Sequence, residues 1–422
     1  MPASSSNKES VVPMLSRRIA LLGSSAILAG SAAASAETRR TPPAPPAKPA
    51  GSGRKPKEGS SGSPADTPLG PVDTAARWAF IQDYDTGAML LEKAADDEMP
   101  PSSMTKLMTI YLVYDRLKQG RLRLEDELPV SERAWRMGGS KMFVQIGSTV
   151  KVEDLIRGVI VQSGNDACIV FAEAISGSEE QFAELMNVKA KEIGLTKSNF
   201  RNATGWPDPE QRMSARDIAT LARRIIRDFP EYYHYDAEKS FKYNGIEQEN
   251  RNPMVQKGTA DGLKTGHTDA GGYGLVASSI RNGRRILLVL NGMASMRERA
   301  EESGRLMDWA FANFEDVTLF SAGDAIERVP VWLGTAPTVP LVAGREVLIT
   351  MPRNWRKNAS IKIAYEQPIR APVMKGDTLG KLTVSGQGVP AMTVPLLAGA
   401  DVPRLSLPGR AMAVLSHYVT GS

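Results

Sequence analysis

Three short segments of this sequence combine the residue types that acyl transfer through a serine requires. They are Ser103-Met104-Thr105-Lys106, Ser163-Gly164-Asn165 and Lys264-Thr265-Gly266, in that order along the chain. A serine hydroxyl beside a lysine can become a nucleophile, because the amine can accept its proton. A second hydroxyl can relay that proton, and a second lysine can bind an anionic group of a substrate. The segments together predict a nucleophile, a base, a proton relay and an anion-binding group.

Ser103 is the serine whose surroundings best fit a nucleophile. A lysine also follows three positions after Ser5, Ser52 and Ser148, but those serines lie in polar or Pro/Gly/Ser-rich stretches. Ser103 follows two prolines and begins a segment with apolar residues at helical spacing, which predicts a buried helix. In the first turn its backbone N–H lacks an intrahelical partner and can bind an oxyanion. In isolation the same pattern would indicate only a helix cap, since serine is a preferred N-cap residue.

Lys106 is the predicted general base for Ser103. It follows Ser103 by three residues and therefore lies on the same face of the helix. An apolar environment and a second cation, Lys264, would favour its neutral form, which can accept the serine proton. The chain has three histidines, and none stands in a recognisable Ser-His-Asp order. A lysine base is therefore the better hypothesis.

Ser163 and Asn165 are predicted to lie in a loop between two helices, whose apolar residues span 152–160 and 168–172. A loop held between packed helices can direct a hydroxyl and an amide into a cleft. Ser163 would relay a proton between Lys106 and the leaving group, and Asn165 would hold the amide backbone of the substrate. On its own, Ser-Gly-Asn is ordinary turn composition.

Lys264, Thr265 and Gly266 are predicted to lie on a strand that precedes a β-hairpin with the turn Asn282-Gly283. Lys264 and Thr265 can bind a substrate carboxylate, and Gly266 allows a peptide backbone to approach closely. The backbone N–H of His267 is then placed as the second oxyanion donor. Its imidazole is expected to be a partially buried, hydrogen-bonded group, with a catalytic role as the alternative.

The chain resembles the D-alanyl-D-alanine carboxypeptidases, which are low-molecular-mass penicillin-binding proteins. The resemblance includes the three segments above and the spacers between them, and it covers about residues 76–408. The similar stretches are 101–109, 162–167, 202–209, 214–217, 250–252, 261–267, 272–278, 330–332 and 371–376.

The resemblance implies both a fold and a reaction. The fold would be an α/β (α+β) catalytic domain of the penicillin-recognising serine transpeptidase and β-lactamase-like type, followed by a small all-β sandwich. Ser103 would attack the carbonyl between the two terminal D-alanines of a peptidoglycan stem pentapeptide, D-alanine would leave, and water would hydrolyse the acyl-enzyme. β-Lactam antibiotics would acylate the same serine. No cofactor and no metal ion are expected.

Two alternative functions remain open from the sequence. A β-lactamase shares the first and third segments, but its middle segment is Ser-Asp-Asn. The stretch between Asn165 and Lys264 also offers no clear acidic loop that would position a deacylating water. The third possibility is a cell-wall binding or scaffolding protein with an inactive site. Inactive relatives would be expected to lose Ser103 or Lys106 first, and both are present.

Charge and cysteine content set further limits. The chain has 52 basic and 47 acidic residues and a formal net charge of +5, without a basic block interleaved with aromatic residues. Nucleic-acid binding is therefore not expected. The single cysteine, Cys168, excludes an intramolecular disulfide. It is expected to be a small core residue, with a thiol lining the cleft as the alternative.

The N-terminal residues are predicted to direct export. In residues 1–36, Arg17-Arg18 precede an apolar run, and Ala34-Ser35-Ala36 resembles a signal-peptidase site. Residues 37–72 are rich in Pro, Gly and Ser and are predicted to form a disordered linker. The protein is therefore expected in the periplasm or cell envelope.

The remaining chain is predicted to form two domains and a tail. The catalytic domain would span 73–319, with a strand pair around residues 85–87 and a helix at 297–314. Five short strands would form the β-sandwich of residues 324–408. The tail, 409–422, would carry a short helix, Arg410 to Val419, with at most weak peripheral contact to the inner membrane.

Overall fold

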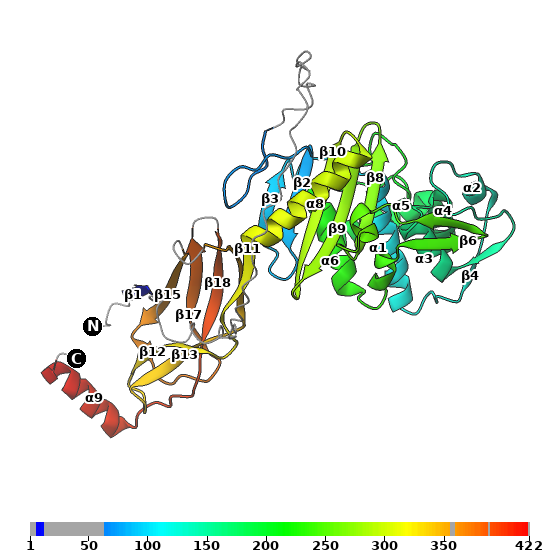
Figure 1. The fold of residues 1–422 in the computed structure, drawn as a ribbon. Helices are drawn as coiled ribbons and strands as arrows, with labels where there is room; N and C mark the ends of the chain where they lie inside the picture. The colour runs from blue at the N-terminus through cyan, green and yellow to red at the C-terminus, as the bar shows by residue number, and fades with distance from the viewer. Residues whose placement is uncertain (1–5, 12–62, 355–358, 387–388, 421–422) are drawn as a thin grey trace, which may run out of the picture.

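The computed structural model describes residues 6–11, 63–354, 359–386 and 389–420. They form a larger domain of helices and sheet, then a smaller all-β domain, and the C-terminal helix lies at the far end of the smaller domain (Figure 1). The predicted order, a mixed catalytic domain followed by an all-β domain, is confirmed.

A five-stranded antiparallel sheet forms the centre of the larger domain, in the order β3-β2-β10-β9-β8. The strands are β2 (Trp78–Asp83), β3 (Met89–Lys93), β8 (Gly262–Thr268), β9 (Gly272–Arg281) and β10 (Arg284–Met293). The strand pair expected around residues 85–87 and the hairpin at Asn282-Gly283 are both present. Because β8 ends the sheet, the segment that contains Lys264 has one free strand edge beside the helices.

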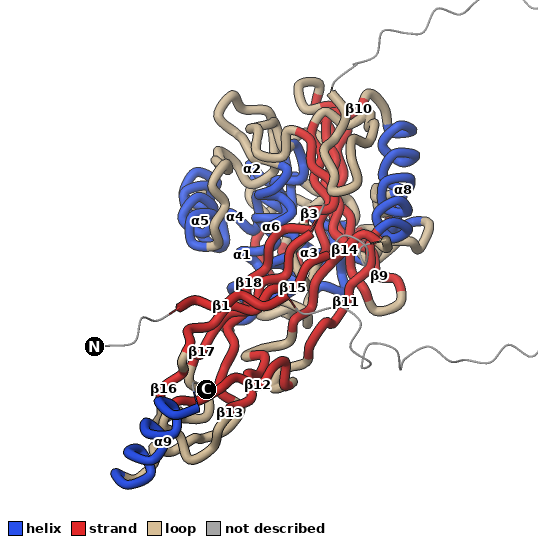
Figure 2. Tube along the Cα trace, turned by 90° about the vertical axis from the view of Figure 1, so that its left-hand side faces the viewer, coloured by secondary structure: helices blue, strands red, loops and turns tan. Residues whose placement is uncertain are grey.

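Both faces of this sheet are covered by packed side chains. Successive residues of β10 point alternately into the two cores. Ile286 and Leu288 pack in one core with α8 (Met296–Asn313), whereas Leu287 and Val289 pack with the helical block on the opposite face. Figure 2 shows α8 on one side of the sheet and α4, α5 and α6 on the other. A strand that is apolar at successive positions is typical of a sheet buried on both faces.

The helical block carries the first two segments of the candidate site. Its helices are η1 (Ser102–Thr105), α1 (Lys106–Lys118), α2 (Glu132–Arg136), α3 (Val152–Ile160), α4 (Asn165–Ser176), α5 (Glu179–Glu192), α6 (Ala215–Asp228), η2 (Tyr233–Ala237) and α7 (Pro253–Gln256). Two small hairpins complete it, namely β4 (Glu127–Pro129) with β5 (Thr149–Lys151) and β6 (Ser240–Tyr243) with β7 (Ile246–Glu249). Cys168 is fully buried on α4, as expected of a core residue.

The smaller domain contains a seven-stranded sheet in the order β1-β15-β17-β18-β13-β12-β16 and the pair β11-β14. Its strands are β1 (Ser6–Val11), β11 (Phe314–Phe320), β12 (Ala325–Trp332), β13 (Thr338–Ala343), β14 (Val347–Pro352), β15 (Ala359–Gln367), β16 (Ile369–Arg370), β17 (Thr378–Gly386) and β18 (Val389–Ala398). All five expected strands are present. β13 was not expected, because Pro340 interrupts its sequence, and proline usually argues against a strand interior.

Two predicted boundaries are wrong. The linker was expected to reach residue 72, but Ala65 pairs with Val72, and Asp66 pairs with Glu92 of β3. Ala65 is fully buried, so this stretch already packs on the larger domain, although it has no apolar periodicity that would reveal it. The catalytic domain was expected to continue to residue 319, but β11 pairs with β14 and belongs to the smaller domain.

A half-buried arginine joins the two domains. The Nε of Arg284, from β10, lies 3.0 Å from Asp83 of β2 and 3.0 Å from Asp316 of β11. Thr350 of β14 donates to Asp316 at 2.8 Å and lies 2.5 Å from the hydroxyl of Thr86. Burial, with the Asp83 charge second, raises the pKa of Asp316 to about 6. A network of polar side chains therefore holds the two domains together, in addition to the chain that connects them.

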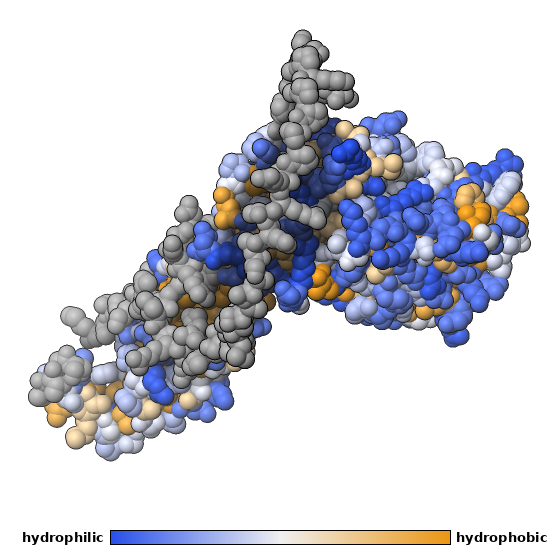
Figure 3. Space-filling model, viewed as in Figure 1, coloured by the Kyte–Doolittle hydropathy of each residue, from blue (hydrophilic) through white to orange (hydrophobic). Residues whose placement is uncertain are grey.

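The C-terminal helix α9 (Leu407–Thr420) is longer than the sequence indicated. Leu407, Met412, Leu415 and Tyr418 are all exposed on it, and Figure 3 shows apolar surface at this end of the molecule. None of the helices within the described residues has the length and apolar character required to cross a membrane.

Candidate active site

Ser103 and Lys106 lie together at the start of the first helix. Ser103 is in the 3₁₀ turn η1, and Lys106 is the first residue of α1. The Nζ of Lys106 lies 2.9 Å from the Oγ of Ser103 and donates to the carbonyl oxygen of Thr204 at 2.5 Å. This places the predicted base within proton-transfer distance of the predicted nucleophile.

Burial controls the charge of Lys106. The side chain is fully buried, and this burial lowers the pKa of its ammonium to about 8, with Arg251 acting in the same direction. Cys168, Asp166 and Glu179 oppose the shift. A pKa near 8 leaves an appreciable neutral fraction at neutral pH, which a base requires.

Ser163 lies in the loop between α3 and α4, as expected, whereas Asn165 is already the first residue of α4. Ser163 adopts a left-handed backbone conformation with φ of 58°, and its buried Oγ has no hydrogen-bond partner among the described residues. It makes no hydrogen bond to Lys106, so its role as a proton relay stays a prediction. The Nδ2 of Asn165 donates to the carbonyl of Gly138 at 2.8 Å, which orients the side chain.

Lys264, Thr265 and Gly266 lie on the edge strand β8, against the turn that carries Ser103. The first two are buried, with 4% and 6% of their surfaces exposed. A Cβ on Gly266 would lie 3.1 Å from the carbonyl oxygen of Pro101. A larger residue here would therefore require the turn before Ser103 to shift by a few tenths of an ångström. The expected strand position of all three residues is confirmed.

His267 differs from the expectation. Its side chain is exposed rather than partially buried, and its ring stacks on Tyr273 with the centroids 3.9 Å apart. Ring stacking, not burial, holds the imidazole, because β8 and β9 place His267 and Tyr273 opposite each other. The role of its backbone N–H as an oxyanion donor stays a prediction.

Two arginines that the sequence did not single out, Arg251 and Arg299, influence the charge of Lys264. Burial, then the charges of Lys106 and Arg251, hold the pKa of Lys264 well below its usual value, and Arg299 contributes in the same direction. Arg299 is 7% exposed, and its Nε has no hydrogen-bond partner within the described part of the chain. None of these cations forms an ion pair with a described carboxylate. Such a cluster favours an anionic ligand.

The loop that follows α5 positions the Lys106 amine. The Oδ1 of Asn202 accepts hydrogen bonds from the backbone N–H groups of Thr204, Gly205 and Trp206 at 3.2, 2.8 and 3.0 Å. The carbonyl of Ala203 accepts from Thr109, and that of Thr204 accepts from Lys106. Two successive carbonyls of this loop are thereby fixed against α1.

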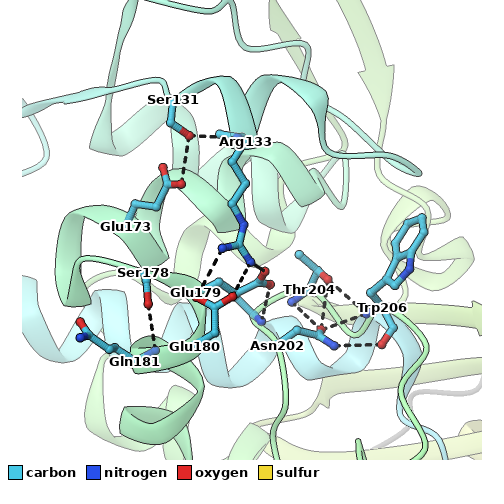
Figure 4. A network of polar contacts seen from close by, with 12 residues as sticks. Ser131, Arg133, Glu173, Ser178, Glu179, Glu180, Gln181, Asn202, Thr204 and Trp206 are labelled. Atoms are coloured by element: carbon cyan, nitrogen blue, oxygen red, sulfur yellow. Dashed lines mark hydrogen bonds and ion pairs between the residues drawn. The ribbon is translucent and has the colours of Figure 1, made fainter.

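A buried carboxylate ties this loop to the neighbouring helices, as Figure 4 shows. The Oε1 of Glu179 accepts from the backbone N–H of Ala203 at 3.1 Å, and its Oε2 pairs with Arg133 at 2.7 Å. Arg133 also pairs with Glu180, whose side chain is 68% exposed. Glu179 therefore supports the loop whose Thr204 carbonyl accepts the hydrogen bond of Lys106. Glu180 contacts Arg133 but not this loop.

Removing this support should have a measurable effect. Glu179→Ala is expected to lower the free energy of unfolding by about 1–3 kcal/mol, because it leaves the buried N–H of Ala203 without a partner. It should also slow acylation of the serine by a fluorescent penicillin. Glu180→Ala is the matched control and should cost less than about 1 kcal/mol, as exposed ion pairs do. Equal effects of the two substitutions on unfolding and acylation would contradict the assigned difference.

The sequence identified the residues of the three segments, and the structure places the first segment against β8 and packs α1 against α4, which follows Ser163. It missed Thr204, Glu179, Arg251 and Arg299. Thr204 acts through its backbone carbonyl, which no side-chain pattern reveals. Arg299 lies on α8 among several charged residues, and the sequence does not show that Arg299, at 7% exposure, is one of the buried ones.

Two protein-family models match most of the described chain. Residues 64–294 match the family described as D-alanyl-D-alanine carboxypeptidase, and residues 314–404 match the C-terminal domain of penicillin-binding protein 5. The D-alanyl-D-alanine carboxypeptidase DacA of Haemophilus influenzae is 38% identical over 349 residues, which cover 81% of this chain and 88% of that protein. DacC of Escherichia coli is 38% identical over 336 residues, with coverage of 78% and 84%.

Solved structures agree with the sequence matches. Penicillin-binding protein 5 from Haemophilus influenzae superposes with a TM-score of 0.71 at 38% identity, over 79% of this chain and 99% of that chain. Penicillin-binding protein 6B from Escherichia coli gives a TM-score of 0.66 at 33% identity, over 78% and 96%. With both domains and their order in agreement, the chain belongs to the D-alanyl-D-alanine carboxypeptidase family, the serine peptidases of the low-molecular-mass penicillin-binding type.

Proposed function

We propose that Ser103 is the nucleophile with which this protein removes the terminal D-alanine from peptidoglycan stem pentapeptides. The observation that carries the proposal is the 2.9 Å contact between the Oγ of Ser103 and the Nζ of a buried lysine, Lys106. Burial favours the neutral amine, and a neutral amine at this distance can accept the hydroxyl proton.

In the acylation step, the Oγ of Ser103 attacks the carbonyl carbon between the two terminal D-alanines, and its proton moves to Lys106. The backbone N–H groups of Ser103 and His267 would stabilise the oxyanion of the tetrahedral intermediate. Collapse of this intermediate breaks the peptide bond. The proton passes from Lys106 through Ser163 to the amine of the departing D-alanine, and an ester remains on Ser103.

In the deacylation step, a water molecule attacks the ester carbonyl and transfers a proton to Lys106. The ester bond breaks, Ser103 recovers its proton, and the shortened tetrapeptide leaves. A β-lactam would acylate Ser103 through the same first step. Asn165 would hold the substrate backbone, since its Nδ2 is already oriented by Gly138.

The carboxylate of the terminal D-alanine would bind beside Lys264 and Thr265. Lys264 and Arg299 are buried, Arg251 is exposed, and none of the three cations pairs with a carboxylate among the described residues. A substrate carboxylate would relieve their mutual repulsion and restore the charged form of Lys264. This requirement for a terminal carboxylate favours a carboxypeptidase reaction over cleavage inside a longer peptide.

The reaction is tested by incubating the protein with diacetyl-L-Lys-D-Ala-D-Ala and measuring free D-alanine. We expect steady release by the unchanged protein and a loss of at least about 10³-fold in Ser103→Ala. Thr67→Ala, which alters a half-buried hydroxyl that bonds only Gly70 and Leu69 among the described residues, serves as the control.

The same assay separates the alternatives that the sequence left open. No release of D-alanine, combined with stable penicillin labelling of Ser103, would replace the proposal with a slow-turnover binding protein. Rapid hydrolysis of a β-lactam without D-alanine release would replace it with a β-lactamase.

Export and membrane contact are proposed on the sequence and on α9. The apolar run and the cleavage site after Ala36 lie outside the described residues, so the export proposal rests on their sequence alone. Sequencing the N-terminus of protein recovered from the periplasm tests it, because an uncleaved start would contradict it. The exposed apolar side chains of α9, among them Leu407, Met412 and Leu415, would give at most weak peripheral contact with the inner membrane. Tight sedimentation with anionic vesicles would contradict that weakness.

A further inference from the structure

One edge of the seven-stranded sheet in the smaller domain is formed by a strand of the proposed export segment. β1 pairs antiparallel with β15, in a register that runs from Ser6 opposite Gln367 to Val11 opposite Lys362. Figure 1 shows β1 beside β15 at this edge. The only other strand that pairs with β15 among the described residues is β17. Cleavage after Ala36 would therefore leave β15 as a free edge strand.

A free β15 edge can bind another extended strand. An edge strand presents backbone N–H and C=O groups that lack partners, and a further strand can pair with them. Strand addition of this kind derives its affinity from main-chain hydrogen bonds. β1 already occupies the edge in this way over six residues, in the antiparallel direction. Without β1, the edge is therefore a binding site for a strand that runs antiparallel to β15.

The side chains of β15 alternate between the two faces of the sheet. Those that point into the core of the smaller domain are Ile361, Ile363 and Tyr365. Lys362 and Glu366 are exposed on the opposite face, and Ala364 lies midway between them. Charges on an edge strand usually oppose the addition of another strand. Here the two charges have opposite signs and stand at equal distances from Ala364, so their arrangement is self-complementary.

This arrangement favours a second copy of the chain as the partner. In an antiparallel pair of two β15 strands centred on Ala364, Lys362 of each copy lies directly opposite Glu366 of the other. The two-fold symmetry of such a pair creates two opposite-charge contacts on the exposed face. A register shifted by two residues would instead place Lys362 opposite Ala364 or Pro368. Charge complementarity therefore selects a single register, centred on Ala364.

We infer that β15 pairs with β15 of a second copy of this chain once residues 1–36 are removed, so that the two smaller domains share one continuous sheet. Lys362 and Glu366 fix the register of this pair. Before removal, β1 occupies the same edge and keeps the longer chain monomeric. Because a single strand pair buries less surface than a standard protein interface, the dimer forms reversibly and depends on protein concentration.

The first test compares the full chain, residues 1–422, with the chain that begins at residue 37. Sedimentation of both is measured from about 1 to about 100 µM, the range of weak reversible complexes. The full chain should sediment as a monomer throughout, and the shortened chain should shift towards a dimer as its concentration rises. A shortened chain that stays monomeric over this range would refute the inference, as would equal dimerisation of the two chains.

Charge exchange in the shortened chain tests the register. Lys362→Glu places carboxylates opposite each other at both contacts and should raise the dissociation constant of the dimer about tenfold, and Glu366→Lys should do the same with two ammonium groups. The double variant restores both opposite-charge contacts and should return the constant to its original value. Lys375→Glu is the matched control, because Lys375 is exposed in a turn whose backbone bonds Asp401, away from β15. It should leave the constant unchanged.

The exchange separates this edge from other surfaces. All the substituted side chains are exposed, so each variant should fold, and recovery in the double variant excludes a folding defect as the cause of the single effects. A dimer that neither single substitution weakens would place the interface elsewhere and overturn the inference. A double variant no tighter than the single ones would overturn it as well. Either result leaves the proposed release of D-alanine untouched, because none of the proposed active-site residues lies on β15.

Discussion

Lys106→Ala is expected to slow acylation of Ser103 by about 10²–10⁴-fold, the usual contribution of a positioned general base. Without the amine, the hydroxyl of Ser103 loses the base that lies 2.9 Å away. The measurement is the rate at which a fluorescent penicillin labels the protein. Lys191→Ala, on the exposed side of α5, is the control and should retain the original rate. If Lys106→Ala kept that rate, the assignment of Lys106 as the base would be wrong.

The pH dependence of acylation provides a second readout of the same assignment. Burial lowers the pKa of Lys106 to about 8, and the neutral amine is the active form. Acylation should therefore rise about tenfold per pH unit below pH 8 and level off above it. This rising limb should disappear in Lys106→Ala. A limb that persisted unchanged in the variant would show that a different group accepts the proton.

The segments that carry side-chain chemistry could be predicted from the sequence because they sit on strongly patterned elements. Ser103 begins an apolar-periodic helix, and Lys264 precedes a hairpin with the strong turn signal Asn282-Gly283. The two-domain order followed from the change to short alternating strands. In each case a local sequence pattern marks a surface that is buried in the structure.

The parts that the sequence did not reveal depend on backbone groups and long-range contacts. The carbonyl of Thr204 carries no residue-type signal, yet it accepts the hydrogen bond of Lys106 across 98 residues. Glu179 begins α5 like many first-turn acids, and its role arises only because Ala203 folds back onto it. The junction at Asp316 likewise requires Arg284 and Asp83, which lie far away in the chain.

Gly205 shows how strongly this folded-back loop constrains the site. Its φ is +80°, a region that favours glycine, and an added Cβ would lie 1.8 Å from the carbonyl oxygen of Ser102 and 3.0 Å from Thr105 Oγ1. The carbonyl belongs to the backbone immediately before Ser103, so it cannot move without moving the nucleophile. The loop must therefore move instead, and the neighbouring carbonyl of Thr204 would lose its position beside Lys106.

Gly205→Ala is expected to lower the free energy of unfolding by about 2–5 kcal/mol, through left-handed backbone strain and overpacking together. Gly194→Ala separates the two causes. Gly194 has a similar φ of +85°, but nothing lies within 4 Å of its added Cβ, so this control should cost only about 1–2 kcal/mol. Urea unfolding measures both variants, and penicillin labelling should slow in Gly205→Ala alone. If the two variants lost equal stability and both labelled normally, the close contact between the Thr204 loop and the Ser103 turn would not constrain the active site.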